Sequence, residues 1–233
     1  MLADGIPDGL VKESPPPVPK RGTRPPTVLW IGGLIPRKAP ALALRAFALL
    51  LADIPDARLV VLGDGPLRPH MERLAARLGV AGSVCFQGRL PWAEALTAYD
   101  VADVMLFTSL RDSFGVQSLE AWARGLPVVH LDHQGVGDFS APDGAVSVAL
   151  GDPSDLPRRL GRALAMVLTD REAHSRMAAA GITWARQHTW TAKVQLIEKL
   201  YNAVLSGPAN PSPEGLQCRT AGTLSDATNE SSA

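Results

Sequence analysis

Short apolar runs alternate with helix-like segments along most of this chain, and that alternation limits what it can fold into. The apolar runs lack the polar residue at every second position that marks a sheet with one face in water. They therefore predict strands buried on both faces, as in a parallel sheet. The predicted strands are residues 27–31, 57–63, 83–88, 103–109, 126–131 and 145–150. The predicted helices are residues 39–54, 66–80, 91–102, 115–125, 153–169, 171–187 and 190–205.

Right-handed crossovers between these strands predict an α/β fold, a doubly wound parallel sheet with additional C-terminal helices. Such a sheet binds ligands at the carboxyl ends of its strands, where loops lead into helices. Five loops follow predicted strands and should therefore meet at one edge. These loops are residues 32–38, 63–66, 88–91, 109–115 and 132–138.

The two ends of the chain differ in composition from its middle. Residues 1–26 are rich in Pro, Gly and charge around "SPPPVPKRGTRPP", which predicts an extended linker without a core of its own. Because the chain opens on a linker, we expect another segment to precede Met1. Residues 206–233 are small and polar, which predicts a disordered tail.

Charge and cysteine content argue against several classes of protein. The 23 basic and 23 acidic residues balance, so nothing favours a nucleic-acid partner. Cys85 and Cys218 provide neither a disulfide framework nor a metal cluster, and they fit a reducing compartment. Cys85, in "SVCFQG", is predicted to be a small core residue.

Two further absences bear on location. No apolar run approaches the roughly 18 residues of a membrane span, and the start of the chain does not resemble a signal peptide. We therefore expect no transmembrane segment and a cytoplasmic protein, either free or peripheral at the inner face of the membrane.

Two common phosphate-binding motifs can be rejected. "GGLIPRKA" lacks the glycine before the lysine and the hydroxyl after it that a P-loop requires. Neither this stretch nor "GDGPLR" supplies the G-x-G-x-x-G of a dinucleotide site. Arg37 and Lys38 nevertheless precede a predicted helix, where cations and helix amides both favour an anion. The alternative is a solvated basic pair on a surface loop.

Two carboxylates, Asp112 and Glu120, flank a small turn and the start of a predicted helix. Asp112 could be an ordinary turn or capping residue, and Glu120 a solvent-facing helix residue. However, Leu119 and Ala121 flank Glu120 in a helix with few other charges. Such a helix should be well buried, and a buried carboxylate needs hydrogen-bond donors, which ligand hydroxyls could provide.

Several motifs taken together resemble a known family. "WIGGLIPRKAPALALRAFALL", "LVVLGDGPLRPHMERLAARLGV", "SLRDSFGVQSLEAWARGLPVV" and "TWTAKVQLIEKLYNAVL" occur in this order. Over roughly residues 27–205 they resemble the C-terminal half of the family-4 retaining glycosyltransferases, which have the GT-B fold. The resemblance implies a linker (1–26), a Rossmann-like nucleotide-sugar-binding domain (27–190), a crossover helix (191–205) and a tail (206–233).

The resemblance also implies a role for each site residue. Glu120 would accept hydrogen bonds from the ribose hydroxyls, Asp112 would contact the donor sugar, and Lys38 would neutralise the diphosphate; these three are the expected catalytic residues. The turn and the first helical amides would face the sugar and the pyrophosphate, and the loop after residue 88 would read the base. The expected donor-binding residues are Gly33, Arg37, Lys38, Arg89, Leu90, Ser113, Phe114, Gly115, Val116, Gln117 and Glu120.

Two positions depart from the family pattern. Gly33 stands where the family usually has an arginine, so one phosphate-neutralising charge is missing unless Arg37 replaces it. Asp112 stands where the family has glutamate, which shifts the sugar contact or routes it through water.

The resemblance implies transfer of a hexose from a UDP-, GDP- or ADP-linked donor with retained anomeric configuration. No metal and no separate cofactor are expected, because Lys38 and helix amides would balance the leaving-group charge. The N-terminal acceptor-binding domain is expected to be missing from this chain and to act in cis or in trans. The alternatives are a non-catalytic module that binds a nucleotide sugar or a partner subunit, and a sugar-nucleotide epimerase or phosphorylase on the same fold.

Overall fold

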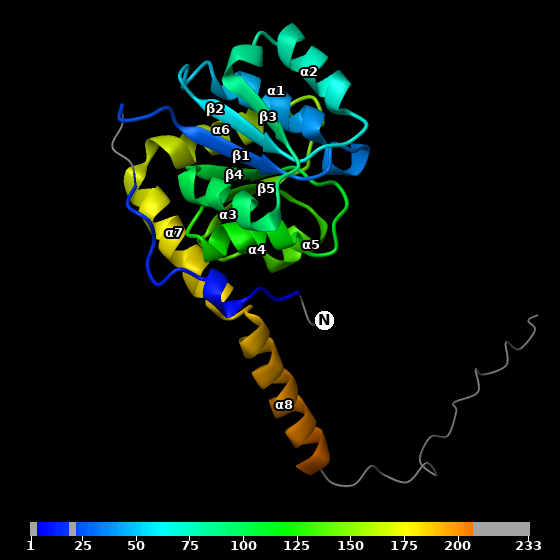
Figure 1. Cartoon of the computed structure of the whole chain (residues 1–233), viewed down its shortest axis with the longest axis vertical. Coiled ribbons are helices and arrows are strands. Elements are labelled where there is room, and N and C mark those ends of the chain that lie inside the picture. Colours follow the sequence, from blue (N-terminus) through cyan, green and yellow to red (C-terminus); the bar gives the residue numbers. More distant parts are fainter. Residues whose placement is uncertain (1–3, 19–21, 207–233) are drawn as a thin grey trace, which may run out of the picture. The chain divides into compact units, whose positions relative to one another are not determined.

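A six-stranded parallel sheet forms the centre of the protein, as seen in a computed structural model that describes residues 4–18 and 22–206 (Figure 1). The strand order is β3-β2-β1-β4-β5-β6, and each neighbouring pair is parallel. The chain therefore starts in the middle of the sheet, builds one half outward, and returns to build the other half. The strands are β1 (Thr27–Ile31), β2 (Arg58–Leu62), β3 (Val84–Gly88), β4 (Val104–Phe107), β5 (Val128–Asp132) and β6 (Ala145–Ala149).

Helices connect the strands and complete the domain, confirming the doubly wound α/β fold. The α-helices are α1 (Pro40–Leu50), α2 (Arg68–Arg77), α3 (Trp92–Val101), α4 (Val116–Ala123), α5 (Gln134–Phe139), α6 (Leu156–Thr169), α7 (Arg171–Arg186) and α8 (Trp190–Ser206). Among the described residues there are also three short 3-10 helices, η1 (Asp8–Leu10), η2 (Pro36–Lys38) and η3 (Ala81–Ser83).

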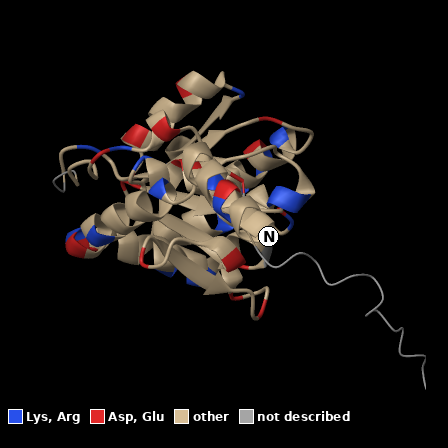
Figure 2. Cartoon of the chain, turned by 90° about the horizontal axis from the view of Figure 1, so that it is seen from below, with Lys and Arg blue, Asp and Glu red and all other residues tan. Residues whose placement is uncertain are grey.

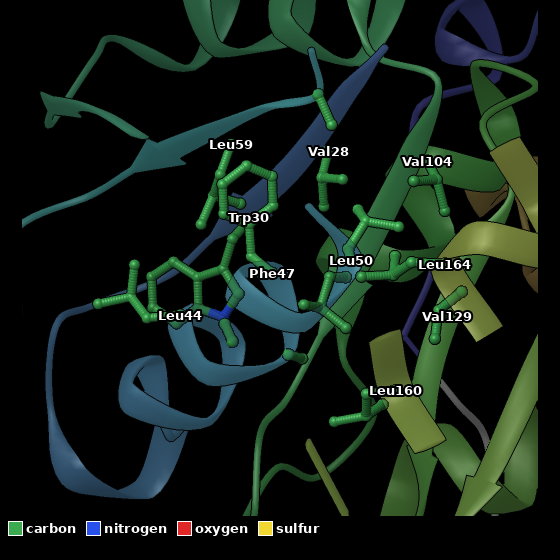
Figure 3. Close-up of a cluster of buried hydrophobic side chains, with 14 of the residues drawn as sticks. Val28, Trp30, Leu44, Phe47, Leu50, Leu59, Val104, Val129, Leu160 and Leu164 are labelled. Atoms are coloured by element: carbon green, nitrogen blue, oxygen red, sulfur yellow. The ribbon is translucent and has the colours of Figure 1, made fainter. Parts of the chain in front are cut away.

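The central strands β1, β2 and β4 send alternate side chains into two separate cores. Val28 and Trp30 pack with α1, α2 and α6 on one face of the sheet, and Figure 3 shows part of this cluster. Leu29, between them in sequence, packs with α3 and α4 on the opposite face. Both faces of the central strands are thus covered, which explains why their sequences are continuously apolar. All four residues of β4 are buried.

Two local expectations are corrected by the structure. Residues 132–138 are predicted to be a loop that follows a strand, yet residues Gln134–Phe139 form α5. A Cβ on Gly135 would lie 2.1 Å from the carbonyl oxygen of Ser113, so this close approach requires glycine. Cys85 is exposed rather than buried, because β3 is an edge strand.

The N-terminal segment packs against the domain. Ile6 is 1% exposed, and its amide donates to the His188 carbonyl oxygen at 3.1 Å while its carbonyl accepts from the Trp190 amide at 2.9 Å. Leu10 is also buried in the core shared by α3 and α4. Residues 4–18 thus pack on the core of the domain, and their role as a linker to another domain stays a prediction.

The end of the chain is only partly described. The first compact unit of the chain ends at Gln195, and a second unit begins at Leu196. Residues 196–206 of the second unit form the rest of α8. The helix predicted over residues 190–205 is confirmed, but its role as a crossover stays a prediction. The expected tail lies beyond the described residues from position 207 onward.

Candidate functional site

The loops that follow β1, β2 and β3 meet at the carboxyl edge of the sheet. The Gly32 amide donates to the Leu62 carbonyl oxygen at 2.9 Å, and the Gly63 amide donates to the Gly88 carbonyl oxygen at 2.7 Å. Beside these contacts lies a cavity of about 290 Å³. Its lining residues are Ile31, Gly32, Gly33, Leu62, Gly63, Asp64, Arg89, Leu90 and Ala95. Three of the expected donor-binding residues therefore line one cavity.

Lys38 does not match the alternative of a solvated basic residue. It is 7% exposed, and its Nζ lies 5.4 Å from the centre of the Phe107 ring. The Thr108 hydroxyl donates to the Lys38 carbonyl oxygen at 2.9 Å, which holds the backbone of η2 against the end of β4. Arg37 is exposed instead, and it donates to the Arg111 carbonyl oxygen at 3.0 Å.

Lys38 and Asp112 form an ion pair between the loop after β1 and the loop after β4. Burial is the largest single influence and raises the pKa of the Asp112 carboxyl. The hydrogen bond and charge of Lys38, the charge of Arg37 and the Gly115 amide together outweigh burial, so the pKa of Asp112 falls below its usual value. Asp112 is thus an anion at neutral pH.

The turn after Asp112 leads directly into α4. Gly115 is the N-cap residue with φ of 79°, and a Cβ there would lie 3.0 Å from the Phe107 ring. Glycine is therefore required by both the backbone conformation and the space. Phe114 is buried and packs against Phe139 of α5. The first amides of α4, which include those of Val116 and Gln117, form the end of a helix that favours an anion.

The Glu120 carboxylate is half-buried and has two donors from α3. Tyr99 donates its hydroxyl to Oε2 at 2.7 Å, and Trp92 donates its Nε1–H to Oε1 at 2.9 Å. Burial, then the charge of Glu120, then this hydrogen bond raise the pKa of Tyr99 well above its usual value. The prediction that Glu120 needs donors is confirmed, but protein side chains provide at least two of them.

The structure brings the expected site residues together in two groups. Lys38, Asp112 and the turn with Ser113, Phe114 and Gly115 surround the end of β4. Gly33, Arg89 and Leu90 line the cavity beside β1 and β2. Helix α3 links the second group to Glu120, since Ala95 lines the cavity while Trp92 and Tyr99 reach Glu120.

Three residues of the site, Trp92, Tyr99 and Phe107, were not predicted from the sequence. For Trp92 and Tyr99 the sequence does contain a feature that could have indicated them. Trp92 and Tyr99 lie seven residues apart in a predicted helix, which places them on one helical face directly after a site loop. Their partner could not be read from the sequence.

A second cavity lies at the opposite, amino-terminal edge of the sheet. It has a volume of about 300 Å³, and none of the expected site residues lines it. Its wall includes Arg24, whose Nη1 donates to Asp103 Oδ2 at 2.7 Å. The chemistry expected from the sequence therefore lies at the other edge.

In the part of the chain that the structure describes, the distribution of charged residues, possible metal ligands and apolar helices does not indicate another type of site. In the view of Figure 2, basic and acidic residues are interspersed along the chain. Within residues 4–18 and 22–206, no group of three or more His, Cys, Asp or Glu side chains could hold a metal ion. No helix of the described chain has the length and apolar character needed to cross a bilayer.

Comparisons with known proteins agree on one family. The profile of the family described as "Glycosyl transferases group 1" matches residues 12–184. A D-inositol 3-phosphate glycosyltransferase of Thermobispora bispora is 32% identical over 197 residues, which cover 81% of this chain and 45% of that protein. The chain thus spans less than half the length of this curated relative.

Solved structures show the same fold. WaaG, a glycosyltransferase of lipopolysaccharide biosynthesis, matches with a TM-score of 0.69 and 22% identity, over 88% of this chain and 56% of that one. The pneumococcal O-GlcNAc transferase GtfA, in complex with UDP and GlcNAc, matches with a TM-score of 0.69 and 15% identity, over 88% of this chain and 39% of that one. The fold is accordingly the Rossmann-like half of a GT-B structure.

Proposed function

The chain belongs to the glycosyl transferases of group 1, and from this we propose that it is the nucleotide-sugar-binding half of a retaining transferase of family 4. The observation that carries the proposal is the position of Lys38. This buried cation lies at the carboxyl edge of the sheet, and it contacts Phe107, whose ring also supports Gly115 at the start of α4. A cation beside a helix amino terminus suits the diphosphate of a nucleotide sugar.

The donor would extend across both groups of site residues. The base would occupy the cavity beside Arg89 and Leu90, and Glu120 would accept from the ribose hydroxyls. The diphosphate would lie between Lys38 and the first amides of α4. Asp112 would contact the sugar hydroxyls, and Arg37 would supply additional positive charge. UDP in the complexes of two similar structures, GtfA and HepE, favours a uridine nucleotide.

The proposed reaction transfers the sugar to an acceptor hydroxyl with retention. A bond forms between the anomeric carbon and the acceptor oxygen, and the bond between the anomeric carbon and the phosphate oxygen breaks. The electron pair leaves with the nucleoside diphosphate, and the acceptor proton passes to the departing phosphate. Lys38 and the α4 amides would stabilise this leaving group electrostatically, so we propose that no metal is required.

The acceptor would need a second domain. The described domain would supply one wall of a two-domain cleft, and proximity between two substrates accounts for much of the barrier reduction in group transfer. We propose that an N-terminal domain, present in cis or in trans, binds the acceptor.

A thermal-shift panel tests the donor. UDP, GDP and ADP and their glucose and N-acetylglucosamine derivatives would each be added to the purified 233-residue chain. One nucleoside diphosphate should raise the melting temperature, since a ligand that binds only the folded state stabilises it. No shift with any of them at millimolar concentration would contradict the proposal.

One observation favours a second candidate, a non-catalytic binding module. Val194 of α8 is 51% exposed, and apolar residues continue on this helix at Ile197, Tyr201 and Val204. Such a stripe suits a subunit contact. Nucleotide binding without transfer, even with an N-terminal domain supplied, would support this candidate.

A further inference from the structure

We propose that Trp92 and Tyr99 of α3 are positioning residues that orient the Glu120 carboxylate toward the ribose of a bound nucleotide. This inference rests on the proposed function of the same site. It adds two residues from another helix to the recognition of the donor, and neither of them needs to touch the donor itself.

The contacts assign one donor to each carboxylate oxygen. The Tyr99 hydroxyl lies 2.7 Å from Oε2, and the Trp92 indole nitrogen lies 2.9 Å from Oε1. Two donors that come from different positions on one helix fix the plane of the carboxylate as well as its location. A single contact would leave the carboxylate free to rotate about its terminal bond, whose torsional preferences are broad.

The carboxylate retains acceptor capacity for a ligand. Each oxygen of an ionised Glu can accept two hydrogen bonds, so four positions exist and the two donors of α3 use two. A ribose presents two neighbouring hydroxyls, which match the remaining positions. The contacts from α3 therefore do not compete with the proposed role of Glu120; they determine where its remaining lone pairs point.

Helix α3 is a firm support for this arrangement. Tyr99 is 2% exposed, and α3 lies beside α4 (Figure 1). A further hydrogen bond connects α3 with the end of α4, because Arg124 Nε donates to Asp100 Oδ1 at 2.9 Å. Asp100 also pairs with Lys12 of the N-terminal segment at 2.7 Å. The position of α3 relative to α4 is thus held independently of Glu120.

The same helix begins next to the proposed base site. Arg89 and Leu90 line the cavity, and Trp92 follows them as the first residue of α3. The distance between the base and the ribose carboxylate is therefore set through a single rigid element. Tyr99 remains protonated at neutral pH, because its pKa is raised by burial and by Glu120, so it acts as a donor throughout.

The first experiment measures discrimination for ribose. The affinities of UDP, of 2′,3′-dideoxy-UDP and of inorganic pyrophosphate would be measured by calorimetry for wild type, Tyr99→Phe and Trp92→Phe. ADP or GDP and their dideoxy forms would replace the uridine pair if the thermal-shift panel favours them. Tyr99→Phe removes one hydrogen bond and keeps the ring, and Trp92→Phe removes the indole N–H while leaving a smaller aromatic ring, so in each variant the ratio of UDP affinity to dideoxy-UDP affinity should fall by about tenfold. Pyrophosphate affinity should not change.

Matched variants separate positioning from general stability. Trp190→Phe replaces a tryptophan with the same exposed fraction, 53%, and Tyr201→Phe replaces the second of the two tyrosines. Asp100→Asn loosens the contact between α3 and α4 without touching Glu120. Trp190→Phe and Tyr201→Phe should keep the wild-type discrimination, and Asp100→Asn should lower it clearly less than Tyr99→Phe does. If Asp100→Asn lowers it as much as Tyr99→Phe does, the helix contact alone is responsible and the proposal is overturned.

A second measurement needs no nucleotide. The Trp92 indole N–H cross-peak, assigned as the one that disappears in Trp92→Phe, should shift in the ¹H–¹⁵N spectrum of Glu120→Gln. A peak that stays in place overturns the contact with Glu120. If the peak shifts but wild type does not distinguish UDP from dideoxy-UDP, the contact stands, while the ribose role of Glu120 and the positioning proposal both fail.

Discussion

The pairing of Lys38 with Asp112 determines which properties of the protein a substitution of Lys38 should affect. They are 74 residues apart in the sequence, and as isolated loop residues they would be expected to act separately. Because Lys38 is buried and paired with Asp112, removing the lysine also leaves a partly buried carboxylate without its main counter-charge. A single substitution therefore affects binding and stability together.

The first prediction concerns Lys38→Ala. Affinity for the nucleoside diphosphate should fall by about 1.5–3 kcal/mol, the range for a hydrogen bond to a charged group. Urea unfolding should also show lower stability, by about 1–3 kcal/mol, because Asp112 loses the hydrogen bond and the charge of Lys38. The double variant Lys38→Ala/Asp112→Asn should recover stability but not nucleotide affinity. Calorimetry showing unchanged affinity in Lys38→Ala would contradict the diphosphate role.

The Glu120 carboxylate could bind the ribose of a nucleotide or could only connect two helices. Its two protein donors would also fit a carboxylate that only joins α3 to α4. Glu120→Gln should weaken nucleotide binding and leave pyrophosphate binding unchanged if the carboxylate holds ribose. Equal weakening of both ligands, measured by calorimetry, would show that Glu120 mainly holds the helix in place.

At the scale of elements, β5 carries a buried titratable group. His130 is fully buried, and its Nε2 has no hydrogen-bond partner among the described residues. Burial lowers the pKa of His130, while the Leu131 carbonyl and the charge of Asp132 oppose this shift without cancelling it. The neutral imidazole is therefore the form that the folded strand accommodates.

The third prediction follows from this shift. The unfolded chain binds a proton near pH 6.5 and the folded chain only at lower pH. The contribution of His130 to stability is thus complete above pH 6.5 and is lost as the pH falls toward the folded pKa. Urea unfolding at pH 7.5 and pH 5.5 should show a smaller pH-dependent loss in His130→Leu than in wild type. The exposed His70 provides the control, and His70→Gln should keep the full wild-type loss.

At the scale of the whole molecule, the N-terminal segment joins elements that are distant in sequence. Ile6 hydrogen-bonds on both sides of Thr189 and contributes to the core that contains α3 and α4. Lys12 adds an ion pair to Asp100 of α3. The segment therefore belongs to the folded domain, and cleaving it should weaken the site side of the sheet as well.

The fourth prediction tests this packing. Ile6→Ala should lower the free energy of unfolding by about 2–4 kcal/mol, the usual cost of removing a buried branched side chain. The exposed Val194→Ala should cost far less. Denaturant unfolding monitored by tryptophan fluorescence would measure both. A loss below about 0.5 kcal/mol for Ile6→Ala would show that the segment is not packed in solution.

The fifth prediction concerns activity. The purified 233-residue chain should bind nucleotide but transfer no sugar to an external acceptor, because under our proposal the described domain binds only the donor. Adding an N-terminal domain from a similar transferase, fused or as a separate chain, should restore transfer measured by release of the nucleoside diphosphate. Robust turnover by the isolated chain would contradict the proposed division of roles.

The sequence by itself determined the order and type of nearly every element. Apolar continuity and helical spacing are local properties, and they are sufficient to predict six parallel strands and the edge at which their loops meet. The same local signals singled out Lys38, Asp112 and Glu120. The resemblance to a family then attached roles to these residues, and those roles stay predictions.

Only the tertiary structure decided which residues meet. The pairing of Lys38 with Asp112, and of Glu120 with α3, depends on the order of the strands and the packing of helices that no local pattern records. Cys85 is exposed because β3 lies at an edge, and the backbone of α5 approaches Ser113 so closely at Gly135 that a Cβ would not fit there. Contacts between distant residues arise from the arrangement of whole elements. Periodicity in the sequence therefore predicted the helices and strands, whereas the contacts between them depend on the tertiary structure.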